Sequence, residues 1–147
     1  MRRSAEIVHG DASMAVRSYR DLIAWQLADR FKKEVFRLLR ESPDAWNDLR
    51  FRNQLLDAAT SVTSNLAEGF LRYSPGEFRK FIDYGLGSLA EAEGRLDDGI
   101  ELRYFRADAC AQAFLLARRC LTASIRLKQS QQRFMRSTGA KSRRRRT

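Results

Sequence analysis

The sequence is poor in the residues that carry most catalytic and redox chemistry. Only one histidine and two cysteines occur in 147 residues. His9, the single histidine, is far from either thiol in sequence, and a di-iron bundle needs two Glu-x-x-His motifs. Cys110 and Cys120 are ten positions apart in one predicted helix, about 15 Å along its axis, too far for a disulfide. We therefore expect two reduced thiols and a protein that is not an enzyme and uses no metal or cofactor.

Long apolar runs are also missing. No run approaches the roughly 18 to 20 residues that a helix needs to cross a bilayer, and the two N-terminal arginines are not followed by the apolar stretch of a secretion signal. We expect a cytoplasmic protein without membrane contact. No segment alternates apolar and polar residues with period two, so the sequence predicts no strand.

Acidic residues are absent from one end of the chain. Residues 128–147 hold eight Lys or Arg and no Asp or Glu, whereas residues 21–127 hold sixteen of each sign. The net charge of +10 therefore belongs to the ends. We divide the chain into a flexible N-terminal segment (1–18), a helical domain (19–127) and a basic tail (128–147), which finishes the last helix and is then disordered.

Four stretches of the domain repeat apolar residues at alternating steps of three and four, the spacing of one helix face. Ser42 and Pro43 end the first helix, and Ser74, Pro75 and Glu77 have the pattern of a capping box that begins the third. We predict an all-α fold, an antiparallel up-down-up-down four-helix bundle. The four apolar stripes are Ala24, Ala28, Phe31, Val35 and Leu38; Leu55, Ala59, Val62, Leu66 and Gly69; Phe78, Ile82, Gly85, Leu89, Ala92, Leu96 and Gly99; and Ala109, Ala113, Leu116, Cys120, Ala123 and Leu127.

The third helix carries glycine at interior positions, where each costs about 1 kcal/mol relative to alanine. Gly85 and Gly99 alternate with large apolar residues, and Gly87 and Gly94 lie between them. We interpret the small-residue line as a place where a neighbouring helix backbone comes close. A phosphate-binding glycine loop is disfavoured, because such loops follow a strand and open a helix.

Further apolar residues fall outside the four stripes. A monomeric bundle needs one apolar face per helix, and monomers rarely expose large apolar patches. The surplus predicts contacts between copies, and hence a homo-oligomer. The residues concerned are Leu22, Trp25, Phe36, Phe81, Tyr84, Phe114, Leu121 and Ile125.

Polar residues follow a second line on the middle helices. Ser61, Asn65 and Glu68 share one face of the second helix, and similar spacing occurs on the third. We predict an assembly seam of hydrogen bonds between helices or between copies. Contact with a ligand or with nucleic acid stays open, as does magnesium binding by two carboxylates, and charge pairs of Arg52 with Glu91 and of Arg79 with Glu68 are expected. The predicted seam is Gln54, Ser61, Asn65, Glu68, Ser88, Glu91 and Arg95.

The basic tail is the candidate nucleic-acid contact. Its cations neutralise phosphates and release counterions without reading sequence, and Phe134 stands among them as a residue on which a base can stack. The alternative is a disordered end that only aids solubility. The predicted contacts are Lys128, Arg133, Arg136, Lys141, Arg143, Arg144, Arg145 and Arg146.

Three runs resemble a known family: YRDLIAWQLADRF, QLLDAATSVTSNLAEGF and RYSPGEFRKFIDYGLGSLAEAE. Over roughly residues 19–105 they are similar to the bacterial four helix bundle proteins found in intervening sequences of large-subunit ribosomal RNA genes. The resemblance implies a homopentamer of four-helix protomers. It also implies similarity to the accessory variability determinant of diversity-generating retroelements, which binds nucleic acid and partners a reverse transcriptase.

Together these patterns predict a non-enzymatic homo-oligomer, pentameric by resemblance, that binds RNA or DNA with little sequence specificity. The alternative is an adaptor that docks a partner protein, such as a reverse transcriptase to which it is an accessory subunit.

Overall fold

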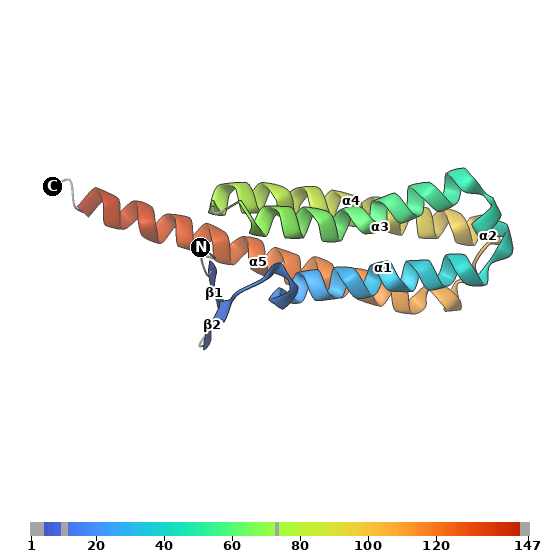
Figure 1. The fold of residues 1–147 in the computed structure, drawn as a ribbon, viewed down its shortest axis with the longest axis horizontal. Helices are drawn as coiled ribbons and strands as arrows, with labels where there is room; N and C mark the ends of the chain where they lie inside the picture. The colour runs from blue at the N-terminus through green and yellow to red at the C-terminus, as the bar shows by residue number, and fades with distance from the viewer. Residues whose placement is uncertain (1–4, 10–11, 73, 145–147) are drawn as a thin grey trace.

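The computed structural model describes residues 5–9, 12–72 and 74–144 of the chain, and helices dominate them (Figure 1). Within these ranges lie two strands, two short 3-10 helices and five α-helices. In chain order they are β1 (Ala5–His9), β2 (Ala12–Val16), η1 (Tyr19–Asp21), α1 (Ile23–Glu41), α2 (Pro43–Asn47), α3 (Leu49–Phe70), α4 (Pro75–Glu101), η2 (Asp108–Cys110) and α5 (Ala111–Arg144).

The two strands correct the expectation that the chain has none. They pair antiparallel, from Ala5 opposite Val16 to His9 opposite Ala12. Each has only five residues, and the β-branched Ile7 and Val8 are adjacent, so their apolar residues do not alternate. A period-two test therefore misses this hairpin, although β-branched residues favour strands.

The helix boundaries follow from caps that the sequence places correctly. The Ser74 side chain accepts a hydrogen bond from the Glu77 backbone N–H, with Pro75 in the first turn of α4. Ser42 ends α1 and caps α2 by accepting from the Ala45 N–H. These side chains satisfy donors that a helix leaves unpaired at its start.

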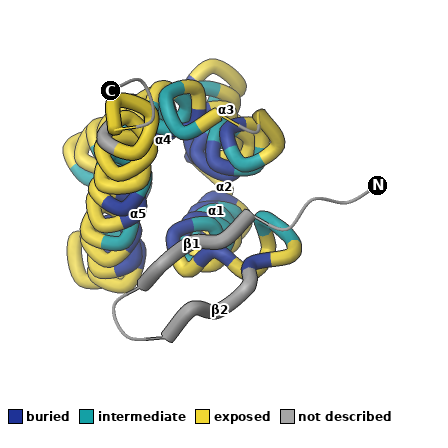
Figure 2. Tube along the Cα trace, turned by 90° about the vertical axis from the view of Figure 1, so that its left-hand side faces the viewer, coloured by how far each residue is buried: buried dark blue, intermediate teal, exposed yellow. Residues whose placement is uncertain are grey.

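The predicted apolar stripes form the core, on the inner sides of the long helices (Figure 2). Phe31, Leu55 and Ile82 are fully buried. Two stripe residues of the last helix are exceptions, because Ala123 is only half-buried and Ala109 is exposed. Ala109 lies in η2, whose tighter winding of three residues per turn shifts its direction, and Cys110 is buried instead.

The four long helices lie side by side (Figure 1). α3 packs on α1 and α4, and α5 packs on α1 and α4. α3 and α4 run antiparallel, since Gly69 lies against Phe81 while Phe51 lies against Gly99. Among the described helices, none has both the length and the apolar character required to span a bilayer.

Close approach explains one of the glycines in α4. A Cβ atom at Gly99 would lie 2.6 Å from the Phe105 ring and 2.9 Å from the Phe51 ring. At Gly85 it would lie 3.6 Å from the Val62 carbonyl oxygen of α3, which is an ordinary contact distance, so this position faces a neighbouring helix but could hold an alanine. Gly87 and Gly94 differ, because no atom lies within 4 Å of a Cβ built there.

α5 is the longest helix, with 34 residues, or about 51 Å. Beyond Ser130 none of its described residues is buried, and this part projects from the other helices (Figure 1). We call residues 131–144 the overhang. The sequence predicts disorder after the end of this helix, and the described part of the tail is helical to Arg144.

Candidate functional site

The centre of the predicted seam is a hydrogen-bonded cluster that joins α3 to α4. The Ser88 hydroxyl donates to Ser61 Oγ at 2.8 Å. The Asn65 amide donates to the same Oγ at 2.9 Å and to the Ser61 carbonyl oxygen at 2.8 Å. All three side chains are half-buried, so their hydrogen bonds are shielded from water on one side.

The other four residues of the seam lie apart from this cluster. Glu68 is exposed and pairs with Arg72 in the turn that follows α3, and Arg95 donates to Asp98 at 3.2 Å. Gln54 is half-buried and Glu91 exposed, and neither hydrogen-bonds through its side chain to another described residue.

The expected pairs of Arg52 with Glu91 and of Arg79 with Glu68 do not form within the chain. Arg52 instead donates to the Trp46 carbonyl oxygen at 3.0 Å, and its guanidinium lies 4.7 Å from the centre of the Trp46 ring. Glu68 binds Arg72 because a residue four positions further on, just past the end of α3, is within easy reach.

The two seam carboxylates are too far apart to share a magnesium ion. Ser61 and Ser88 lie opposite each other. Glu68 is seven residues beyond Ser61, and Glu91 is three residues beyond Ser88. Because α3 and α4 are antiparallel, these offsets run in opposite directions and add to about 15 Å. No group of three or more potential metal ligands occurs among the residues that the structure describes.

Both thiols are free and fully buried. Burial raises the pKa of Cys110 to about 11 and that of Cys120 to about 11. Cys120 Sγ donates to the Ala24 carbonyl oxygen at 3.6 Å. Because only the thiolate is a strong nucleophile, we expect both thiols to be unreactive at neutral pH.

The strongest electrostatic feature is α5, which contains no acidic residue. Its Lys128 pairs with Asp83 of α4 at 2.6 Å. Within the overhang Phe134 and Met135 are 49% and 40% exposed. The predicted contacts Arg145 and Arg146 lie outside the described residues. The basic residues of the helix are Arg118, Arg119, Arg126, Lys128, Arg133, Arg136, Lys141, Arg143 and Arg144.

Three of these residues were missed by the sequence analysis. Arg118, Arg119 and Arg126 precede residue 128, where the composition changes, and so were counted with the neutral domain. The signal that reveals two of them is spacing, since Arg126 and Arg119 lie seven and fourteen residues before Arg133. Such residues share one helix face.

The fold and its surfaces define a small helical protein with a polar cluster between two helices and one strongly basic helix. The family model of the 23S rRNA-intervening sequence proteins matches residues 20–123. The chain belongs to this family, as its three sequence runs indicated. The match ends before Lys128, so the overhang lies beyond it. No curated protein sequence matches the chain significantly.

Proposed function

We propose that this protein is a cytoplasmic, non-enzymatic homo-oligomer that binds RNA or DNA through the basic part of α5, with little sequence specificity. Its protomer is an antiparallel up-down-up-down bundle of α1, α3, α4 and α5. The observation that carries the proposal is a 34-residue helix without an acidic residue whose basic end projects from the core. The family name, which refers to 23S rRNA, agrees with a nucleic-acid partner.

The physical reason is counterion release. Arg133, Arg136, Lys141 and Arg143 are exposed, so each can meet a phosphate without losing a buried contact. Displacing condensed counterions favours binding and carries no sequence information. Lys128 contributes less, because Asp83 already neutralises it. Phe134 adds an exposed aromatic face for stacking.

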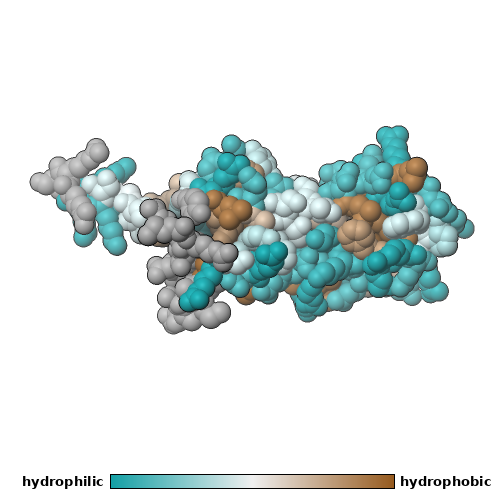
Figure 3. Space-filling view, in the orientation of Figure 1, coloured by the Kyte–Doolittle hydropathy of each residue, from teal (hydrophilic) through white to brown (hydrophobic). Residues whose placement is uncertain are grey.

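Self-association is supported by apolar side chains that the core leaves uncovered. Tyr84, Leu121 and Ile125 are 49%, 40% and 41% exposed, and brown apolar patches interrupt the hydrophilic surface in Figure 3. Leu22 was wrongly counted with this set, since it is 2% exposed and belongs to the core. Several basic helices in one assembly would strengthen binding by avidity, and the resemblance indicates five.

The test is binding of the full chain to labelled 20-nucleotide RNA and DNA strands over a salt series, followed by fluorescence anisotropy. The tail variant Arg136→Gln/Arg143→Gln removes two exposed charges. For single strands its logarithmic salt slope should be smaller by about 1.4, from about 0.7 per lost phosphate contact. The control variant Arg40→Gln/Arg50→Gln removes two exposed charges from the other end of the molecule and should bind like the wild type.

Absence of binding by the full wild-type chain would sink the proposal. The exposed apolar residues would then favour the second candidate function, an adaptor that docks a protein such as a reverse transcriptase. That function predicts complex formation that is insensitive to the tail variant but lost in Leu121→Ser/Ile125→Ser.

A further inference from the structure

Three arginines form a row along α5 that begins on the body of the molecule. Arg119, Arg126 and Arg133 follow one another at intervals of seven residues, which is 20° short of two full helix turns. They therefore lie almost in line, about 10.5 Å apart. All three are exposed, and none makes a hydrogen bond or an ion pair with another described residue. We call them the arginine row.

The row follows the boundary between α5 and α1. A hollow of about 90 Å³ at this boundary is lined by Arg126 and Ala123 of α5 and by Ile23 of α1, among others. Cys120 bonds to Ala24, near the start of α1, whereas Cys110 lies in the electrostatic field of Arg37, near its end. The two helices are therefore antiparallel.

Antiparallel packing brings a fourth arginine to the same boundary. Ile23 and Arg126 line the same hollow. Arg30 lies seven residues after Ile23 on α1, and Arg119 lies seven residues before Arg126 on α5. Because the helices are antiparallel, Arg30 and Arg119 lie at about the same level. Arg30 is exposed and makes no hydrogen bond or ion pair with any other described residue. β1 also lies against α5, yet Arg126 and Arg133 stay exposed.

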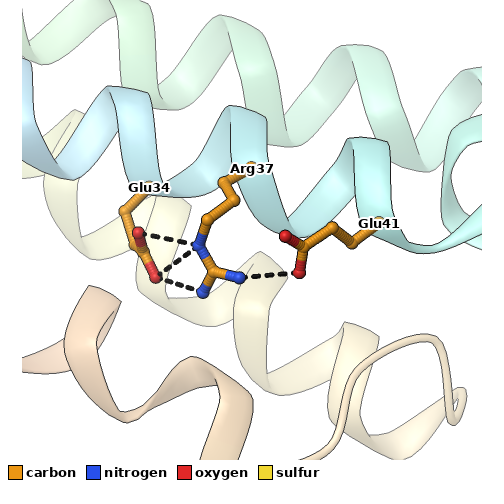
Figure 4. A network of polar contacts seen from close by, with 3 residues as sticks. All are labelled: Glu34, Arg37 and Glu41. Carbon is orange, nitrogen blue, oxygen red and sulfur yellow. Dashed lines mark hydrogen bonds and ion pairs between the residues drawn. The ribbon is translucent and has the colours of Figure 1, made fainter.

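The acidic residues of α1 are already engaged by other cations. Asp29 pairs with Lys32 and Lys33, and Arg37 binds both Glu34 and Glu41 (Figure 4). α5 contains no acidic residue that could pair with the row. Like charges placed along one face repel each other, and no side chain described for α1 or α5 forms an ion pair with this row.

We infer that the phosphodiester backbone of a nucleic acid lies along the α1–α5 boundary and is bound by Arg30 and the arginine row. The inference rests on the proposed function and extends its surface from the overhang onto the bundle. From Arg119 to Arg133 the row measures about 21 Å, which at 3.4 Å per phosphate along one duplex strand spans about six base pairs. We call this proposed binding surface, Arg30 together with the arginine row, the track. The net charge of residues 21–127 is zero and so does not reveal the track, because the acidic residues lie elsewhere in this segment.

The decisive comparison uses two full-length variants with the same loss of charge. The row variant is Arg119→Gln/Arg126→Gln, and the control is again Arg40→Gln/Arg50→Gln. The probes are a 20-nucleotide single-stranded RNA and a 20-base-pair RNA duplex. Circular dichroism melting of each variant checks that the fold is intact, which exposed sites should allow.

The row variant should lose about 1.4 from its salt slope on single-stranded RNA and bind more weakly at every salt concentration, whereas the control should not change. A loss on the duplex as well would identify the shared backbone as the ligand, and a loss on one probe alone would identify that form of RNA. Either result supports the track.

Two results would overturn the inference, and only the first leaves the proposed function intact. In the first, the row variant binds like the wild type while the tail variant loses affinity, which confines the contact to the overhang. In the second, the control loses as much as the row variant, which means that net charge matters and position does not. If the wild type binds neither probe, the proposed function and the track fail together.

Discussion

Two glycines in the α3–α4 pair should respond in opposite ways to the same added methyl group. At Gly69 a Cβ atom would lie 2.7 Å from Phe81 Cβ. That atom is attached directly to the backbone of α4, so a rotamer change cannot relieve the clash and the helices must move apart. At Gly87 no atom lies within 4 Å of the new methyl group.

The magnitudes follow from two opposing terms. Overpacking a well-filled site costs about 1–3 kcal/mol, and exchanging glycine for alanine in a helix returns up to about 1 kcal/mol. Gly69→Ala should therefore lower the free energy of unfolding by up to about 2 kcal/mol. Gly87→Ala causes no overpacking and gains only the higher helix propensity of alanine, so it should raise the free energy of unfolding by up to about 1 kcal/mol.

Urea titration followed by circular dichroism measures both changes, with an unchanged slope as the check on two-state unfolding. Several protein concentrations are needed, because self-association adds to apparent stability. Equal stability of the two variants would refute the close approach of α3 and α4 at Gly69. A destabilised Gly87→Ala whose deficit grows with protein concentration would place Gly87 at a contact between copies.

Two further predictions concern polar and sulfur side chains. Asn65→Ala should lower the free energy of unfolding by about 1 kcal/mol, because it removes the amide that donates hydrogen bonds to two Ser61 oxygens. Glu68→Ala breaks only an exposed ion pair and should cost less than about 0.5 kcal/mol. Equal losses in urea titration would contradict this ranking, and an unchanged oligomer mass for both variants would show that the seam does not hold copies together. The thiols of Cys110 and Cys120, with pKa values raised by burial to about 11, should react with a disulfide reagent at pH 8 only when urea unfolds the chain; rapid reaction of the native protein would show that one of them is exposed.

The sequence predicted what depends on local spacing. Apolar steps of three and four located the core residues of all four long helices, and Ser42 and Ser74 located two boundaries, because caps act within one turn. Ala109 was misplaced since the 3-10 geometry of η2 has a different period. The hairpin of β1 and β2 was not predicted because each strand has adjacent apolar residues, so neither shows the alternation that the period-two test requires.

Side-chain partners were harder to predict than helices. The Ser61–Ser88 bond follows from two polar lines facing each other across an antiparallel pair, and the sequence indicated both lines. The predicted charged pairs do not form because a long side chain has several partners within reach, and Glu68 pairs with Arg72 four residues further along the chain. The arginine row was missed because composition was summed by segment, whereas a surface depends on helix face.

The overhang has a consequence for how this protein would respond to ionic conditions. Its residues pack on no other helix along most of their length, so their helical state depends mainly on local propensity and on repulsion between Arg133, Arg136, Lys141 and Arg143. Salt weakens that repulsion, and a bound polyanion removes it. The overhang should therefore fray at low ionic strength and become helical when its charges are neutralised. The distance that it extends from the bundle would then change when a polyanion binds.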